Sequence, residues 1–240
     1  MAGNEEFEQI RFDLLGNTSE EKKSEIEMLP RHEILLADEK ISPRYLKNRR
    51  RPWYEAVDPK KEYDEFVVLD TETTGVLPFR DEIVEIGAIL YQKGRPVEAF
   101  ETFIRPKGSI PPGATAVNGI TDGMVQDAPR VHEVLPDFDD FVGGRLLVGH
   151  NLDFDLSFLY RHGSRIEDRR REYICTLFEA RKLLVKKGSG TNHFDVLDHR
   201  LETLCDYFGI IIPRAHRAVM DAYGTAEVFL KLQELRKEMP

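Results

Sequence analysis

Two acidic residues at the end of an apolar run have the clearest chemistry in this sequence. The run Phe66–Leu69 leads into Asp70 and Glu72, and a Thr-Thr-Gly turn follows at 73–75. Side chains two apart in a strand point to the same face, so Asp70 and Glu72 are expected side by side. Adjacent carboxylates in a low-dielectric setting repel each other unless a proton or a cation lies between them. Because Mg²⁺ and Mn²⁺ prefer oxygen ligands, the pair is interpreted as half of a metal site. The alternative is a strand end with two solvated acids.

Two later stretches carry acids and histidines that could complete such a site. Residues 150–155 (His-Asn-Leu-Asp-Phe-Asp) join a short apolar strand to a helix, and Asp155 falls near the helix start. Residues 216–221 (His-Arg-Ala-Val-Met-Asp) open the last helix, with Asp221 in its first turns and His216 at or before its start. Each residue alone could be a helix cap or a dipole-stabilising group. That explanation is much less plausible for all of them at once, in this order.

The surrounding pattern predicts the elements that position these acids. Alternating and apolar runs predict strands, and apolar residues at helical spacing predict helices. Residues 108–123 are rich in Gly, Pro, Ser and Thr, so a loop is expected there. After the strand that ends at Asp70, the expected strands are Ile83–Tyr91, Val97–Ile104, Leu146–Gly149 and a short one at 173–177, and the expected helices are Val131–Val142, Phe154–Arg161, 201–208 and 216–235.

Composition and charge narrow the class of protein. The chain has 240 residues, of which 41% are hydrophobic and 32% charged, as in an ordinary soluble globular protein. The formal net charge of −9 argues against coating nucleic acid through bulk charge, but bound cations and local basic patches still allow a nuclease. The sequence has no apolar run long enough to cross a membrane, no secretory signal, and no disulfide pattern in Cys175 and Cys205. We therefore expect a cytoplasmic protein without a membrane partner.

The first 61 residues differ from the rest and are interpreted as a charged N-terminal extension before a main domain at 62–240. Within the extension, residues 47–54 combine a basic run with Trp53 and Tyr54. One interpretation is a contact for nucleic acid or an acidic protein partner, with the aromatic rings available for stacking. The other is a solvated linker whose aromatic residues pack on the main domain, and it is favoured because charge runs are usually solvated.

Taken together, the three motifs resemble the exonuclease domain of the DEDDh family, the group that includes the epsilon proofreading subunit of bacterial replicative DNA polymerase. The resemblance covers residues 66–235 and rests on 70–75, 150–155 and 216–221. His216 stands where another branch of the family has tyrosine, which selects the histidine branch. Connecting stretches that are also similar to the epsilon type are 83–87, 117–120 and 175–181.

The resemblance implies an α/β fold of the ribonuclease H type, with a mixed five-stranded sheet flanked by helices. It also implies 3′→5′ removal of nucleoside 5′-monophosphates with two divalent cations, Mg²⁺ or Mn²⁺. By analogy, Asp70 bridges both cations, Glu72 and Asp221 complete one site, and Asp155 anchors the second. His216 takes the proton from the attacking water, a role that suits the pKa of histidine. Two cations a few Å apart can stabilise both the attacking and the leaving oxygen of a phosphodiester.

Substrate-binding residues are implied by the same resemblance. The turn at 73–75 would line the pocket for the 3′-terminal nucleotide, because the backbone of such a turn can approach a nucleotide closely. The alternative is a turn without a binding role. Asn118 and Gly119 would approach the base and the sugar, although the epsilon subunit typically has His where this chain has Asn118. The expected substrate-binding residues are Thr73, Thr74, Gly75, Asn118, Gly119 and Phe154.

Three functions are compatible with these features. The first is a metal-dependent 3′→5′ exonuclease of single-stranded or frayed DNA, working in proofreading, repair or end trimming. The second is an RNA-directed exoribonuclease of the ribonuclease T type, which would differ in its tolerance of a 2′-hydroxyl. The third is a non-catalytic interaction protein, which the intact set of five catalytic residues argues against. The expected partners are nucleic acid 3′ ends, with DNA favoured over RNA, and a protein partner for the N-terminal extension.

Overall fold

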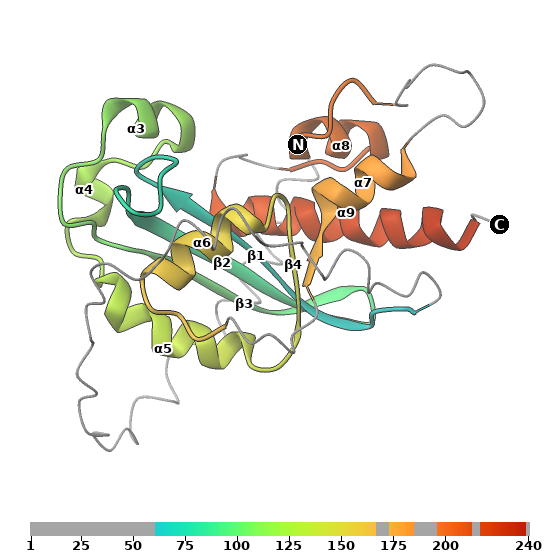
Figure 1. Cartoon of the computed structure of the whole chain (residues 1–240), viewed down its shortest axis with the longest axis horizontal. Coiled ribbons are helices and arrows are strands. Elements are labelled where there is room, and N and C mark those ends of the chain that lie inside the picture. Colours follow the sequence, from blue (N-terminus) through green and yellow to red (C-terminus); the bar gives the residue numbers. More distant parts are fainter. Residues whose placement is uncertain (1–60, 167–172, 185–195, 213–216, 239–240) are drawn as a thin grey trace.

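The computed structural model describes residues 61–166, 173–184, 196–212 and 217–238. In this part of the chain, helices flank a single five-stranded sheet (Figure 1). The basic and aromatic stretch 47–54 lies outside the described residues. In chain order the elements are β1 (Glu65–Thr73), β2 (Ile83–Gln92), β3 (Arg95–Phe103), α3 (Pro112–Asn118), α4 (Asp122–Val125), α5 (Val131–Val142), β4 (Leu146–Gly149), α6 (Asp153–Arg161), β5 (Tyr173–Cys175), α7 (Thr176–Leu183), α8 (Leu201–Phe208) and α9 (Ala218–Glu238).

The sheet is mixed, and β1 occupies its centre. The strand order is β3-β2-β1-β4-β5. The first three strands form an antiparallel meander, whereas β4 pairs parallel to β1 and β5 pairs parallel to β4. Parallel neighbours need crossover connections, and α6 lies in the connection between β4 and β5. This arrangement confirms the expected mixed five-stranded sheet of the ribonuclease H type.

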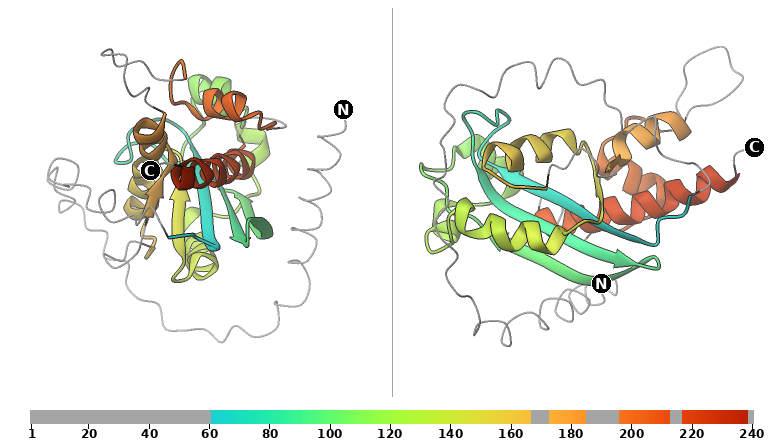
Figure 2. Two further views of the ribbon diagram at one scale, coloured as in Figure 1. Left: turned by 90° about the vertical axis from the view of Figure 1, so that its right-hand side faces the viewer. Right: turned by 60° about the horizontal axis from the view of Figure 1, so that its bottom comes forward.

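The alternation of side chains along β1 divides the core into two layers. Val67 and Leu69 belong to the hydrophobic cluster that includes α5 and α6, whereas Phe66 and Val68 belong to the cluster that includes α9. Figure 2 shows α9 against one face of the sheet and α5 against the other. Because the strand period is two residues, Asp70 follows Val68 on the face covered by α9.

Helix α9 begins directly against β2, and this close approach requires a glycine. A Cβ atom on Gly87 would lie 2.2 Å from the backbone nitrogen of Val219 and 2.3 Å from the carbonyl carbon of Ala218. A side chain at position 87 would therefore push the first turn of α9 away from the sheet. Further along the helix, Ala222 and Phe229 are fully buried in the same cluster.

The expectation that residues 108–123 form a loop is wrong, because the segment contains α3 and α4. Pro112 is the first residue of α3, where the missing backbone N–H costs no hydrogen bond. Gly119 ends α3 with φ of 70°, the left-handed conformation that glycine adopts without strain. The same residues that suggested a loop therefore act as start and stop signals of a short helix.

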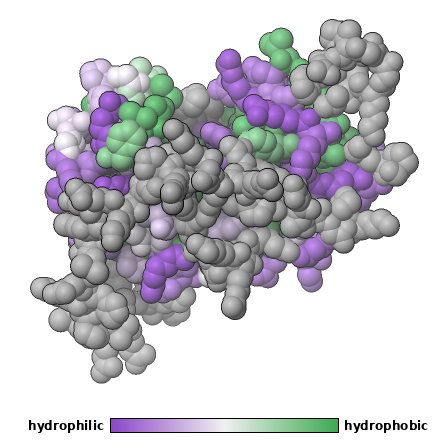
Figure 3. Space-filling model, in the orientation of Figure 1, coloured by the Kyte–Doolittle hydropathy of each residue, from purple (hydrophilic) through white to green (hydrophobic). Residues whose placement is uncertain are grey.

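Exposed apolar side chains occur at several places on the described surface, and one of these places lies next to the end of β1. The loop after β1 and helix α3 expose Val76, Phe79 and Val117, with 72%, 69% and 63% of their surface accessible. Figure 3 shows hydrophobic side chains gathered at its upper left, where Figure 1 places α3. Among the described helices, none is both long and apolar enough to cross a membrane.

Candidate active site

The end of β1 brings the two acids of the first motif to one face of the sheet. In the antiparallel pairing with β2, Asp70 lies opposite Gly87 and Glu72 lies opposite Glu85. Opposite residues of an antiparallel pair share a face, so both acids of β1 lie on the side where α9 begins. Asp70 and Glu72 remain partly exposed, which leaves their carboxylates accessible to a ligand.

Helix α9 supplies a third carboxylate. Asp221 lies in its first turn, where the backbone N–H donates to the carbonyl oxygen of Arg217 at 3.0 Å. One carboxylate oxygen from each of Asp70, Glu72 and Asp221 lies within 4.8 Å of the others. The fold thus joins the first and third motifs of the sequence in one cluster.

Asp155 of the second motif reaches β1 from helix α6. Its side chain is buried, with 2% of the residue surface exposed. One carboxylate oxygen accepts two hydrogen bonds from Thr71, from the backbone N–H at 2.9 Å and from the hydroxyl at 2.8 Å. Because Thr71 lies between Asp70 and Glu72, these bonds hold the second motif beside the first.

Desolvation raises the pKa values of these acids, and neighbouring negative charges raise those of Asp70 and Glu72 further. Desolvation is the largest cause, and it raises the pKa of Glu72 to about 8 and that of Asp155 to about 7. Hydrogen bonds from Thr71 partly offset the effect at Asp155. The pKa of Asp70 is raised well above its usual range, first by desolvation and then by the charges of Asp155, Asp221 and Glu72. Carboxyl groups with pKa values raised in this way keep protons near neutral pH unless a cation replaces the protons.

The donor set of the cluster fits a hard divalent cation. Asp70, Glu72 and Asp221 offer only carboxylate oxygens, the ligands that Mg²⁺ and Mn²⁺ take in proteins. A cation bound among them would neutralise the repulsion that raises the pKa of Asp70. The cluster is therefore a candidate metal site built from the first and third motifs, with Asp155 next to it.

Of the two histidines in the motifs, the structure describes His150 but not His216. His216, the expected proton acceptor, lies outside the described residues and directly precedes Arg217 in the sequence. For His150, the Nδ1 atom lies 2.9 Å from the Thr176 hydroxyl and the Nε2 atom lies 2.9 Å from the carbonyl oxygen of His199. Burial lowers the pKa of His150 to about 4, so the ring is neutral at physiological pH. His150 therefore joins the end of β4 to α7 and to the segment before α8.

The turn after β1 is held by its own hydrogen bonds. The hydroxyl of Thr73 donates to the carbonyl oxygen of Gly75 at 2.6 Å, and the hydroxyl of Thr74 accepts from the N–H of Glu82 at 2.9 Å. A Cβ atom on Gly75 would lie 2.3 Å from Oδ2 of Asp81, so a larger residue there would have to displace that carboxylate. All three residues of the turn are partly exposed beside the acids. Their contact with a nucleotide stays a prediction.

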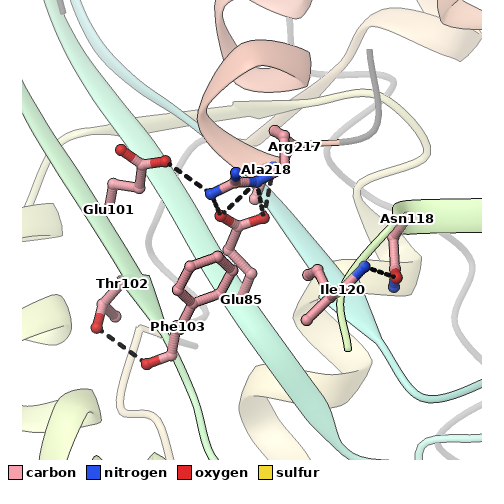
Figure 4. Close-up of polar contacts among 8 residues, drawn as sticks. All are labelled: Glu85, Glu101, Thr102, Phe103, Asn118, Ile120, Arg217 and Ala218. Atoms are coloured by element: carbon pink, nitrogen blue, oxygen red, sulfur yellow. Dashed lines mark hydrogen bonds and ion pairs between the residues drawn. The ribbon is translucent and has the colours of Figure 1, made fainter. Parts of the chain in front are cut away.

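The other expected substrate-binding residues occupy different environments. Asn118 is 4% exposed, and its side-chain amide donates to the carbonyl of Thr73 at 3.3 Å. Its amide oxygen accepts from the N–H of Ile120 at 3.0 Å (Figure 4). Gly119 is exposed at the end of α3, and Phe154 packs against the core cluster beneath α6. Asn118 thus links α3 to the end of β1, and a substrate contact from any of these residues stays a prediction.

Sequence reasoning missed two residues that support the site, Thr71 and Glu85. Thr71 carries the two donors that hold Asp155. Glu85 is fully buried in β2 and pairs with Arg217. A carboxylate inside an otherwise apolar strand was the available signal for Glu85, because a buried charge requires a partner. No comparable signal marks Thr71, whose hydroxyl is common in strands.

Comparison with known proteins agrees with this geometry. Residues 67–229 match the sequence model of the family described as Exonuclease. DNA polymerase III PolC-type of Caldanaerobacter subterraneus subsp. tengcongensis is 38% identical over 175 residues, which are 73% of this chain and 12% of that protein. DNA polymerase III subunit epsilon of Treponema pallidum is 35% identical over 176 residues, which are 73% of this chain and 80% of that protein.

A solved structure with a similar fold is Exonuclease X in complex with 5′ overhanging duplex DNA. It is 28% identical with a TM-score of 0.55, and the match covers 70% of this chain and 91% of that one. The chain spans only a small part of the PolC-type relative but most of the epsilon subunit. The family match includes β1, α6 and the first turns of α9, which carry the four acids. The chain therefore belongs to the exonuclease family.

Proposed function

We propose that this chain removes nucleoside 5′-monophosphates from the 3′ end of single-stranded or frayed DNA by metal-dependent hydrolysis. The observation that carries the proposal is the cluster of Asp70, Glu72 and Asp221, whose carboxylate oxygens lie within 4.8 Å of one another. Asp155, held beside this cluster by Thr71, adds a fourth acid. An oxygen-only donor set of this kind is what phosphodiester hydrolysis with divalent cations requires.

The four acids and one histidine have distinct roles in this proposal. Asp70 is shared by two cation sites for Mg²⁺ or Mn²⁺, Glu72 and Asp221 complete one of them, and Asp155 belongs to the other. When bound, the cations stabilise negative charge on the attacking and leaving oxygens of the phosphodiester. His216 accepts the proton of the attacking water, since an imidazole is an effective general base near neutral pH.

An unpaired DNA end is the substrate that the surroundings of the site support best. Val76, Phe79 and Val117 expose apolar side chains on the loop after β1 and on α3, beside the turn that follows the acids. An aromatic ring such as that of Phe79 can stack on unpaired bases without regard to sequence. The similarity to polymerase III proteins and to a DNA-bound exonuclease favours DNA over RNA. Proofreading, repair or end trimming in the cytoplasm, with a protein partner at the N-terminal extension, is the setting we propose.

The proposal is tested with a single-stranded DNA oligonucleotide labelled at its 5′ end, in Mg²⁺, Mn²⁺ or EDTA. We expect the labelled strand to shorten one nucleotide at a time with either cation and to stay intact in EDTA. Asp70→Asn should abolish the reaction, whereas Asp137→Asn, at an exposed acid of α5, should leave it unchanged. Release of the labelled 5′ nucleotide as the first product would contradict the proposed direction.

Two further substrates test the specificity. RNA of the same sequence should be cleaved more slowly than the DNA, and faster cleavage of RNA would select the exoribonuclease alternative. A fully paired blunt duplex should also be a poorer substrate than the single strand. Equal rates on the duplex and on the single strand would contradict the preference for unpaired ends.

A further inference from the structure

An ion pair between the buried Glu85 and the partly buried Arg217 lies one turn before Asp221, between the start of α9 and strand β2. We propose that Glu85 and Arg217 are positioning residues, whose ion pair fixes the first turn of α9 on β2 and thereby sets where Asp221 meets Asp70 and Glu72. The inference rests on the proposed function of that acid cluster as a cation site. It assigns a role to two residues outside the set of four acids and one histidine.

Glu85, on strand β2, accepts hydrogen bonds from the start of α9. Its fully buried carboxylate accepts hydrogen bonds from Nε of Arg217, at 3.0 and 3.2 Å, and from Nη2 at 2.5 Å. The same carboxylate accepts the backbone N–H of Ala218, the first residue of α9, at 3.1 Å (Figure 4). The first N–H groups of a helix lack partners within the helix, so Glu85 serves as its cap.

The guanidinium of Arg217 is fixed by two further contacts. Its Nη2 atom lies 3.3 Å from Oε1 of Glu101 on β3, and its central carbon lies 4.8 Å from the centre of the Phe103 ring. Figure 4 shows the guanidinium between Glu85 and Glu101. A planar guanidinium makes several directed contacts of this kind at once, which a lysine ammonium does not reproduce. The orientation of Arg217 is therefore set by β2 and β3 together.

A short backbone path connects this anchor to the acid cluster. The carbonyl oxygen of Arg217 accepts the N–H groups of Met220 at 2.8 Å and of Asp221 at 3.0 Å, which closes the first turn of α9. The anchor also adjoins the cluster within the sheet, because Glu85 lies opposite Glu72 in the pairing of β2 with β1. A shift of Arg217 would therefore move Asp221 relative to the acids of β1.

The other end of α9 provides a matched control. Arg236 and Glu179 form a second ion pair, which joins α9 to α7, with 8% and 5% of their side-chain surfaces exposed. Neither residue belongs to the acid cluster. Glu85→Gln and Glu179→Gln are thus the same chemical change at two buried carboxylates that pair with arginines next to or on one helix, and only the first adjoins the site.

The experiment compares these two variants with the wild type in three measurements. They are the Mn²⁺ dissociation constant from the electron paramagnetic resonance signal of free Mn²⁺, kcat and KM on single-stranded DNA, and the thermal midpoint. For Glu85→Gln we expect Mn²⁺ to bind about 10- to 100-fold more weakly, the usual effect of removing a residue that supports a metal ligand. We expect kcat to fall with it and KM to stay close to the wild-type value. Glu179→Gln should lower the thermal midpoint and leave Mn²⁺ affinity and kcat unchanged.

Two variants of Arg217 separate positioning from a simple effect of charge. The double variant Glu85→Gln/Arg217→Met has the same net charge as the wild type but no ion pair, so we expect Mn²⁺ binding to remain weak. Recovery of wild-type affinity in the double variant would overturn the proposal in favour of a charge effect. Arg217→Lys keeps the charge and loses the planar fork, so its affinity should lie between those of wild type and Glu85→Gln.

Wild-type Mn²⁺ affinity and kcat in Glu85→Gln would also overturn the proposal, and a lower thermal midpoint alone would then indicate a purely structural pair. If Glu85→Gln does not fold, Arg217→Lys decides the question by the same measurements, and unchanged Mn²⁺ affinity in that variant would overturn the inference. The Mn²⁺ measurements need no nucleic acid. If the wild type hydrolyses no substrate, the proposed function fails while the test of positioning still stands.

Discussion

The two helices that bring acids to β1 are anchored in different ways. On α6, the carboxylate of Asp155 is itself the anchor, because it accepts the N–H and the hydroxyl of Thr71 in a buried setting. On α9, the anchor lies one turn before Asp221, where Arg217 pairs with Glu85. The site thus holds one acid through hydrogen bonds from two neutral donors to its own oxygen, and the other through a charged pair that fixes its helix. We therefore expect the two sides of the site to respond differently to mutation.

The mutation with the largest effect should be at Asp70, the acid that both sides of the site share. Asp70→Asn should lower the exonuclease rate by at least about 10³-fold, because electrostatic stabilisation of the reacting phosphate is lost from both sides. The same change should raise the thermal midpoint of the metal-free protein, since desolvation and neighbouring charges raise the pKa of Asp70 in the folded state. Single-turnover kinetics and thermal melts in EDTA measure the two effects. A metal-free variant that melts below the wild type would show that the acids do not repel each other as described.

Displacing α9 should have the next largest effect. Gly87→Ala places a Cβ atom against the backbone of Val219 and Ala218, so the start of the helix must shift. We expect a loss of about 1–3 kcal/mol in the free energy of unfolding from overpacking. A displacement of about 1 Å should also cost about 10²-fold in kcat. Gly144→Ala, whose Cβ atom would meet nothing within 4 Å, is the control that should change neither quantity. Wild-type activity in Gly87→Ala would mean that the first turn of α9 does not position the site.

A smaller effect is expected on the α6 side. Thr71→Val removes the hydroxyl donor to Asp155 but keeps the backbone donor at 2.9 Å. We expect about a 10-fold loss of kcat, the lower range for a residue that orients a metal ligand. The matched control is Thr225→Val, because the buried hydroxyl of Thr225 finds no hydrogen-bond partner within the described part of the chain. An equal loss of activity in both variants would contradict a specific role for Thr71.

The smallest expected effect is the pH dependence of stability, and of the stabilisation by Mn²⁺. Glu72 and Asp155 have pKa values of about 8 and about 7 in the metal-free folded protein, whereas unfolded acids titrate near pH 4. The folded state therefore binds more protons between these values, so the stability contributed by these groups falls as pH rises from about 4 to about 8. A bound cation replaces the protons, and the increase in thermal midpoint caused by Mn²⁺ should grow from pH 5 to pH 8.

The difference in thermal midpoint between the Mn²⁺-loaded and the metal-free protein is not affected by the titration of groups away from the site. Burial lowers the pKa of His150 to about 4, which makes its contribution to stability rise with pH between about 4 and 6.5. That contribution is common to both forms and cancels in the difference. An Mn²⁺ shift of equal size at pH 5 and pH 8 would contradict the raised pKa values of the acids.

The sequence predicted the central strand and the acids because both follow from local patterns. A continuous apolar run, Phe66–Leu69, ends at Asp70, and acids near helix starts mark Asp155 and Asp221. The pairing of Glu85 with Arg217 could not be predicted in this way. It joins residues 132 positions apart and depends on how closely α9 packs on β2, which is decided by Gly87. The prediction of a loop at 108–123 was wrong for a different reason. Proline and glycine begin and end short helices as well as loops.

The most direct test of the account is to count the Mn²⁺ ions that bind to the protein without nucleic acid, by calorimetric titration. The account predicts two ions per chain in the wild type, one in Asp155→Asn, and none at the same concentrations in Asp70→Asn. Asp137→Asn should bind as the wild type does. Undiminished Mn²⁺ binding in Asp70→Asn would contradict the central claim that the end of β1 holds the catalytic cations.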